Sequence, residues 1–360
     1  MASAAGTRAT TTSTARTAGS RGSRAISYCT QVQYLRVLIH SSELTGFTAH
    51  AVPSVRPVNM EAPPPAAWPL PVAWLHPPKT GSTFGLTVYR HACSDIPANA
   101  TVGCLPPIAG LTRRFPVAKH CAGGFTSARR VDLHPPSNPH EDHGRLLAML
   151  RAPAAQKASL LSFVLKLATD AEYDRRCSVV CEAPMTTSGL PPAVAREACA
   201  AARAGRLQHL MELVLPPMRG CQAKMLHGTP CLRRSNASEL DPLQPLTATR
   251  VPAAFAFVGV TERWAESVCL FHFLREGGRR PVAAEFVNSR PTSTRARSLS
   301  LELWRGIAAN RSDLMGWLLD DVYDGLLYAR AARHFAAALA KARNRSTWVP
   351  TCVANHRTFS

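Results

Sequence analysis

The stretch Val72-Ala-Trp-Leu-His-Pro-Pro-Lys-Thr-Gly-Ser-Thr-Phe-Gly-Leu-Thr-Val88 is the one around which the chain is organised. Val72 to Leu75 is a short apolar run typical of a buried strand. Residues 77–83 form a turn with one lysine, one glycine and three hydroxyl side chains, and Phe84 begins an apolar pattern that fits a helix. The N–H groups and the dipole of a first helical turn favour an anion, and Lys79 adds a positive charge. The stretch therefore predicts an anion site, with an ordinary Pro-Gly turn after a strand as the alternative.

The turn departs from the Walker A motif, in which the lysine follows the glycines. Here Lys79 comes first and the small residues follow. This order resembles the 5′-phosphosulfate loop of sulfotransferases that use 3′-phosphoadenosine 5′-phosphosulfate (PAPS). It is most similar to Golgi carbohydrate sulfotransferases, including heparan sulfate 2-O- and galactose 3-O-sulfotransferases, which typically read His-x-Pro-Lys-Thr-Gly-Gly-Thr. The matching residues are His76, Pro78, Lys79, Thr80, Gly81 and Thr83, and Ser82 stands where a second glycine is usual.

The resemblance implies roles for the residues of this loop. The 5′-phosphosulfate would be bound by Lys79, Thr80, Gly81, Ser82 and Thr83. Lys79 would also be catalytic, because its ammonium group would neutralise the charge that grows on the departing phosphate oxygen.

A second phosphate element is expected around Arg151. Leu146 to Leu150 reads as a buried strand, and Pro153 suits the first position of a helix. The segment resembles the 3′-phosphate element of sulfotransferases, Leu-Arg-Asp-Pro-x-x-Arg-x-x-Ser. A guanidinium at a strand end can bind a phosphate with two hydrogen bonds, so Arg151 and Ser159 are expected to bind the 3′-phosphate of PAPS. A structural arginine beside a proline turn is the alternative. Arg151, Pro153 and Ser159 match the pattern, Ala152 replaces its Asp, and Lys157 lies one place after its second Arg.

Three later segments resemble the same family in the same order. The first packs beside the cofactor in that family and matches at Gln222, Met225, Leu226 and Gly228. The second predicts a strand from Phe255 to Val260 and a helix capped by Thr261, in which Glu262 would orient groups near the cofactor. The third predicts a helix whose apolar stripe packs in the core, with matches at Asp324, Leu327, Tyr328, Ala331 and Phe335.

The general base is assigned to His120. A short strand that ends at His120 and continues into Gly123-Gly124 would bring the backbone close to a ligand. In the resembled families, a strand after the phosphosulfate loop commonly ends in a histidine element that faces the acceptor. His120 is therefore expected to take the acceptor's proton, although a packing or surface histidine is the alternative.

The composition limits which partners and which cellular compartment the sequence supports. The formal net charge is +19, yet only six of the 42 basic residues are Lys, and no zinc-finger spacing or alternation of basic and aromatic residues indicates a nucleic-acid platform. No carboxylate cluster suggests a Mg²⁺ site, so no metal is expected.

Eleven cysteines and four Asn-x-Ser/Thr sequons favour a lumenal or secreted glycoprotein. Cys221 and Cys231 can close a ten-residue disulfide loop, while Cys177, Cys181 and Cys199 stay open as thiols or disulfide halves. The sequons lie at Asn99, Asn236, Asn310 and Asn344.

The domain organisation follows from shifts in composition. Residues 1–50 read as a disordered or targeting segment, 51–71 as a Pro-rich linker, 72–343 as the sulfotransferase domain and 344–360 as a loose tail. No apolar run is long enough to cross a bilayer. The resemblance implies the Golgi lumen or the secretory pathway, whereas the Arg- and Ser-rich, acid-poor start is also typical of an organelle transit peptide.

We therefore expect an α/β, P-loop-like three-layer fold, with a mostly parallel central sheet flanked by helices and the cofactor at the carboxyl ends of the strands. The expected function is transfer of a sulfuryl group from PAPS to a hydroxyl of a carbohydrate, on a glycan or glycolipid that can itself be anionic. The acceptor pocket would be built from residues 90–145 and 160–220. Two other functions stay open: a non-catalytic basic glycan-binding module and a P-loop nucleotide-dependent kinase.

Overall fold

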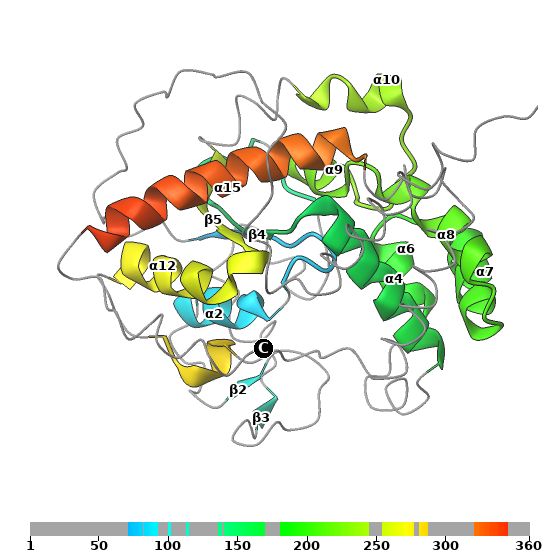
Figure 1. The fold of residues 1–360 in the computed structure, drawn as a ribbon, viewed down its shortest axis with the longest axis horizontal. Helices are drawn as coiled ribbons and strands as arrows, with labels where there is room; N and C mark the ends of the chain where they lie inside the picture. Colours follow the sequence, from blue (N-terminus) through cyan, green and yellow to red (C-terminus); the bar gives the residue numbers. More distant parts are fainter. Residues whose placement is uncertain are drawn as a thin grey trace, which may run out of the picture.

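The structure is a computed structural model that describes residues 71–81, 83–92, 100–101, 113–114, 136–138, 140–169, 181–244, 254–276, 281–286 and 320–344. Its centre is a parallel sheet of three strands in the order β1-β4-β5. The strands are β1 (Ala73–Leu75), β4 (Leu146–Leu150) and β5 (Phe255–Val260). Helices lie on both sides of the sheet, as Figure 1 shows. The expected α/β class, a parallel sheet flanked by helices, is confirmed at this level, and all three strands were predicted from their apolar runs.

The central strand β4 has no exposed residue because it is covered on both edges and on both faces. Ala73 pairs with Leu146 on one side, and Val260 pairs with Leu150 on the other. Along the strand, side chains alternate between two apolar cores, as a period of two requires. Leu146, Ala148 and Leu150 enter the first core, and Leu147 and Met149 enter the second. A continuous apolar run is the expected sequence for a strand buried in this way.

The first core lies between the sheet and a group of helices that follows β4 in the chain. The long helix α4 (Pro153–Thr169) packs against α7 (Pro192–Arg203), which in turn packs against α6 (Glu182–Thr187) and α8 (Leu207–Val214). The short elements η1 (Pro216–Met218), α9 (Cys221–Leu226) and α10 (Ala237–Leu240) complete this side. Pro153 and Pro192 each begin a helix, where the missing N–H of proline costs nothing.

The second core lies under α2 (Phe84–Ala92) and α12 (Trp264–Glu276). The ring of Phe84 stacks on Phe257 and meets Phe271 edge-on, which ties both helices to β5. The C-terminal helix α15 (Val322–Arg343) packs against β5, α12 and α9. It contributes Leu327 to the first core and Phe335 to the second, so its predicted apolar stripe joins the two cores. The remaining described elements are η2 (Thr261–Arg263), η3 (Ala283–Phe286) and the parallel pair β2 (Ala100–Thr101) and β3 (Arg113–Arg114).

Among the described residues, two disulfides lie on the α4 side of the molecule. Cys221–Cys231 closes the predicted ten-residue loop, which confirms that pairing. Cys181–Cys199 joins the start of α6 to α7, so these two cysteines are disulfide halves rather than thiols. Both bridges are buried in the first core.

One local prediction is wrong. Thr261 does not cap a helix, because its hydroxyl donates to the carbonyl oxygens of Thr80 and Leu150, and the regular helix α12 begins only at Trp264. Within the part of the chain that the structure describes, no helix is both long enough and apolar enough to span a membrane. The segments 1–50 and 51–70, His120 and residues 345–360 lie outside the described residues.

Candidate functional site

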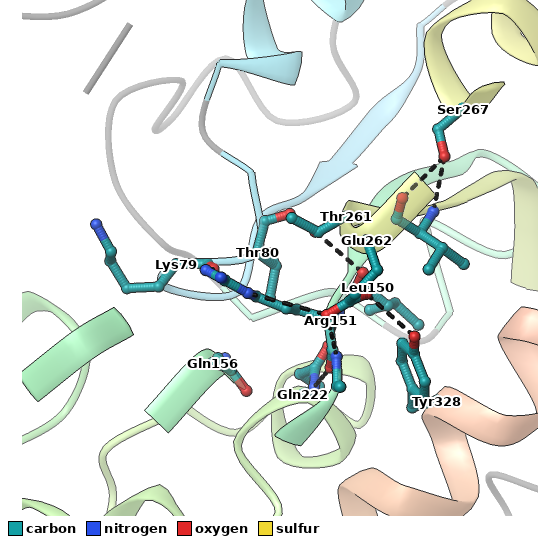
Figure 2. Close-up of polar contacts among 12 residues, drawn as sticks. Lys79, Thr80, Leu150, Arg151, Gln156, Gln222, Thr261, Glu262, Ser267 and Tyr328 are labelled. Atoms are coloured by element: carbon teal, nitrogen blue, oxygen red, sulfur yellow. Dashed lines mark hydrogen bonds and ion pairs between the residues drawn. The ribbon is translucent and has the colours of Figure 1, made fainter. Parts of the chain in front are cut away.

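Three consecutive carbonyl groups of the loop after β1 are hydrogen-bonded to side chains from other elements. Gln156 Nε2 on α4 donates to Pro78 O at 2.9 Å. Arg151 Nη1, just after β4, donates to Lys79 O at 3.2 Å. Thr261 Oγ1, just after β5, donates to Thr80 O at 2.7 Å. The loop is thus held in place by residues that follow both other strands of the sheet (Figure 2).

These bonds orient the peptide groups of the loop. In a trans peptide the C=O and the following N–H point in opposite directions. Because the Thr80 carbonyl turns toward Thr261, the N–H of Gly81 points away from Thr261, and it donates to no acceptor among the described residues. A loop whose carbonyl groups are taken up by protein donors and whose N–H at Gly81 has no acceptor among the described residues has the polarity that an anion site needs.

The backbone of the loop adopts two unusual conformations. Lys79 has φ +65°, the only positive φ of a non-glycine residue in the described part of the chain. A lysine in this region costs on the order of 1–3 kcal/mol and persists only where its surroundings enforce it, as the three side-chain bonds do here. Gly81 has φ +112°, and a Cβ at this position would lie 2.7 Å from Cζ3 of Trp264. Glycine is therefore required at position 81 for both its conformation and the space it leaves.

The turn after β4 is held by two further side chains. Gln222 exchanges two hydrogen bonds with the backbone of Arg151: Arg151 N donates to Oε1 at 3.0 Å, and Nε2 donates to Arg151 O at 2.8 Å. Glu262 Oε1 accepts from Ala152 N at 3.0 Å, and Glu262 Oε2 accepts from the hydroxyl of Tyr328 at 3.0 Å. Burial and the neighbouring Glu262 raise the pKa of Tyr328 far above its ordinary value, so this hydroxyl remains a donor.

The guanidinium of Arg151 lies between this turn and the loop. Its side chain is 24% exposed, and its Nε lies 4.0 Å from Glu262 Oε1, which is an ion pair without a hydrogen bond. Burial lowers the pKa of Arg151, and the charge of Glu262 opposes that shift. Among the described residues only Lys79 O accepts a hydrogen bond from this group, so other N–H donors of its five are available to a ligand.

One face of α4 runs along the loop. Gln156 and Phe163 both touch the loop: Gln156 through Pro78 O, and Phe163 through its ring, whose centroid lies 4.4 Å from Lys79 Nζ. Ser159 stands between them at the helical spacing i, i+3, i+7, so it shares their face. The structure thus brings the half-buried Ser159 to the side of α4 that meets the Lys79 loop.

Two helices begin at this edge of the sheet. α2 starts at Phe84 after the loop, and α4 starts at Pro153 after Arg151. Neither has an acidic residue in its own first turn, but Glu262 Oε1 accepts from Ala152 N just before α4, so this carboxylate offsets the dipole of α4. The N-terminus of α2, Lys79 and Arg151 contribute positive charge to the carboxyl edge of β1 and β4. This edge is where open α/β sheets bind ligands.

The other predicted site residues divide into three groups. Thr80 is fully buried and its hydroxyl donates to Pro77 O at 2.8 Å, so its side chain supports the loop from within. Thr83 is half-buried, and its carbonyl accepts the N–H of Leu86 at the start of α2. Ser82 and His120 lie outside the described residues, and their assignments remain predictions.

The sequence did not predict that Gln156 holds the loop, and it predicted Thr261 as a helix cap rather than as a donor to the Thr80 carbonyl. Both are polar residues within six positions after a buried strand, which is the signal that identifies them, because parallel strands end at one edge. Trp264, whose ring lies against Gly81, has no such signal. Within the described ranges, no three or more His, Cys, Asp or Glu side chains are grouped so that they could hold a metal ion.

Comparisons of this chain with models of protein families, with curated proteins and with solved structures find no match. What the site can do therefore follows from its own geometry.

Proposed function

We propose that this protein is a PAPS-dependent sulfotransferase that transfers a sulfuryl group to a hydroxyl of a carbohydrate acceptor. The observation that carries the proposal is the hydrogen bond between Arg151 and the Lys79 carbonyl. It joins the two elements that resemble the 5′-phosphosulfate loop and the 3′-phosphate element. Both anionic groups of PAPS are attached to one ribose, so the groups that bind them must lie side by side.

The chemistry of the loop suits a phosphosulfate. The N–H of Gly81, which has no acceptor among the described residues, and the N-terminus of α2 would bind negative charge. Lys79 supplies an ammonium group that neutralises the charge on the bridging oxygen when the bond between sulfur and that oxygen breaks. The sulfuryl group then moves to the acceptor oxygen, whose proton is accepted by a base, for which His120 is the sequence-based assignment.

The 3′-phosphate distinguishes PAPS from most other nucleotides. Arg151 has unused N–H donors, and Ser159 is on the α4 face that meets the loop. A guanidinium and a hydroxyl together match the charge and the acceptor oxygens of a phosphate monoester. These two residues would therefore select PAPS over nucleotides that lack a 3′-phosphate.

The proposal is tested by calorimetric titration of the full chain with adenosine 3′,5′-bisphosphate and, separately, with adenosine 5′-phosphate. The wild type should prefer the bisphosphate, and Arg151→Lys should lose most of that preference, because one charge-assisted bond corresponds to roughly ten- to hundredfold in affinity. Lys79→Ala should weaken both ligands. Arg343→Ala, which removes an exposed arginine paired with Glu266, is the matched control and should change neither.

Two other outcomes would point elsewhere. Binding of ATP that requires Mg²⁺, without binding of the bisphosphate, would support a kinase. Heparin affinity that Lys79→Ala leaves intact, without nucleotide binding, would support a glycan-binding module. If the bisphosphate binds, labelled PAPS offered with a panel of desulfated glycans identifies the acceptor.

A further inference from the structure

Glu262 brings a negative charge to a site that is otherwise built for anions. Its side chain is 14% exposed, and each of its carboxylate oxygens has a separate partner. Oε1 accepts from Ala152 N, and Oε2 accepts from the hydroxyl of Tyr328, so the carboxylate is fixed between the turn after β4 and helix α15 (Figure 2).

The relationship of Glu262 to Arg151 is one of charge rather than of hydrogen bonding. The distance of 4.0 Å between Glu262 Oε1 and Arg151 Nε is too long for a hydrogen bond. A guanidinium that is largely removed from water needs a nearby negative charge. Glu262 supplies that charge without taking an N–H of Arg151, whose Nη1 donates to Lys79 O and whose Nε donates to no acceptor among the described residues.

We propose that Glu262 is a positioning residue, the fixed counter-ion of Arg151, and that it weakens the hold of the site on a phosphate group. This inference rests on the proposed function, because it takes Arg151 as the phosphate-binding residue. An arriving phosphate can use the free N–H groups of Arg151 without displacing Glu262 from Ala152 or Tyr328. It then lies close to a carboxylate of like charge, which lowers its affinity.

The consequence for turnover lies in product release. The nucleotide that remains after sulfuryl transfer keeps its 3′-phosphate, so any group that binds this phosphate holds substrate and product alike. A counter-ion that reduces the affinity for both lets the product leave. Removal of the charge should therefore lower kcat, because release of the product becomes slower, while KM for PAPS also falls.

Glu262→Gln tests this inference with little change of shape. A glutamine keeps an oxygen that accepts from Ala152 N, and its amide can donate to the Tyr328 oxygen, since a phenol both donates and accepts. In titrations of the full chain, adenosine 3′,5′-bisphosphate should bind about three- to tenfold more tightly to this variant. Glu266→Gln, which removes the acid paired with Arg263 and Arg343, is the control and should stay within about twofold of wild type. Unchanged or weaker binding by folded Glu262→Gln would overturn the inference.

A second experiment, a double-mutant cycle, tests the pairing of Glu262 with Arg151 without any nucleotide. Urea unfolding is measured for Glu262→Gln in the wild-type background and in an Arg151→Met background. If Glu262 is the counter-ion of Arg151, Glu262→Gln should raise the unfolding equilibrium constant about fivefold in the wild-type background and hardly at all in the Arg151→Met background. Equal effects in both would show that Glu262 only supports Ala152 and Tyr328, which would overturn the inference. If the wild type binds no bisphosphate, the proposed function fails, and this cycle still decides whether Glu262 is the counter-ion.

Discussion

The side-chain amide of Gln222 and the backbone of Arg151 exchange two hydrogen bonds, of 3.0 and 2.8 Å, across 71 residues of sequence. The amide imitates a neighbouring strand and extends the ladder of β4 by one residue beyond its end at Leu150. The position of the Arg151 guanidinium therefore depends on α9, the short helix that carries Gln222.

Gln222→Ala should reduce both stability and ligand binding. It leaves a backbone N–H and a backbone C=O of Arg151 without their partners, which costs about 2–3 kcal/mol of the free energy of unfolding. Affinity for adenosine 3′,5′-bisphosphate should fall because Arg151 is no longer held in place. Urea unfolding and calorimetry measure the two effects. Gln208→Ala, which removes an exposed side chain that donates to Glu212, should change stability by less than about 0.5 kcal/mol. A Gln222→Ala protein as stable as this control would contradict the argument.

Gly81→Ala should damage the loop more than an ordinary glycine substitution does. The new Cβ would meet Trp264 at 2.7 Å, and alanine is strained at φ +112°. We expect a loss of about 2–3 kcal/mol in the free energy of unfolding, together with weaker nucleotide binding. Gly205→Ala is the matched control, since Gly205 has φ +67° but nothing within 4 Å of its Cβ position. It should lose only about 1 kcal/mol and bind the bisphosphate normally. Equal losses in the two variants would show that the contact with Trp264 carries no energetic weight.

Sequence patterns were sufficient for the sheet and insufficient for the contacts around the loop. Strands β4 and β5 were predicted with their observed bounds, because continuous apolar runs between turn signals leave little choice. The bond from Thr261 to Thr80 joins residues 181 apart and depends on strand order, which local patterns do not encode. The assignment of Thr261 as a helix cap was wrong for the same reason. A threonine after a strand can cap a helix, but in the folded chain its hydroxyl donates to the carbonyl oxygens of Thr80 and Leu150.

Loss of the Cys221–Cys231 disulfide should weaken the site as well as the fold. Cys221 Sγ lies 3.3 Å from Gln156 Nε2, the atom that also holds Pro78 O, and Cys221 is adjacent to Gln222. The variant with both cysteines changed to alanine should lose about 2–3 kcal/mol of stability and bind the bisphosphate more weakly. The corresponding double variant of Cys181 and Cys199, which join α6 to α7, should lose similar stability but keep its affinity. Should both variants bind the nucleotide as wild type does, the first disulfide is only a structural crosslink.

The junction between α9 and α15 predicts how stability depends on pH. Asp324 is fully buried and accepts from the N–H groups of Gln222 and Ala223. Burial, followed by the charge of Asp321, raises the pKa of Asp324 to about 7. Lys224 donates to the carbonyls of Pro217 and Arg233, and burial lowers its pKa to about 8.

The pKa of Asp324 is raised and that of Lys224 is lowered, so their joint contribution to the free energy of unfolding is smallest between about pH 7 and pH 8. From pH 3.8 to about 7 the folded state holds a proton on Asp324 that the unfolded state has lost, so this group's stabilisation falls as pH rises. From about pH 8 to 10.5 the unfolded state holds a proton that folded Lys224 has lost, so stability rises with pH. Urea unfolding across this range should show Asp324→Asn with a flatter acidic limb and Lys224→Met with a flatter alkaline limb. A difference between wild type and Asp324→Asn that is constant from pH 4 to 7 would mean that Asp324 is ionised in the fold and that its two backbone bonds outweigh its burial.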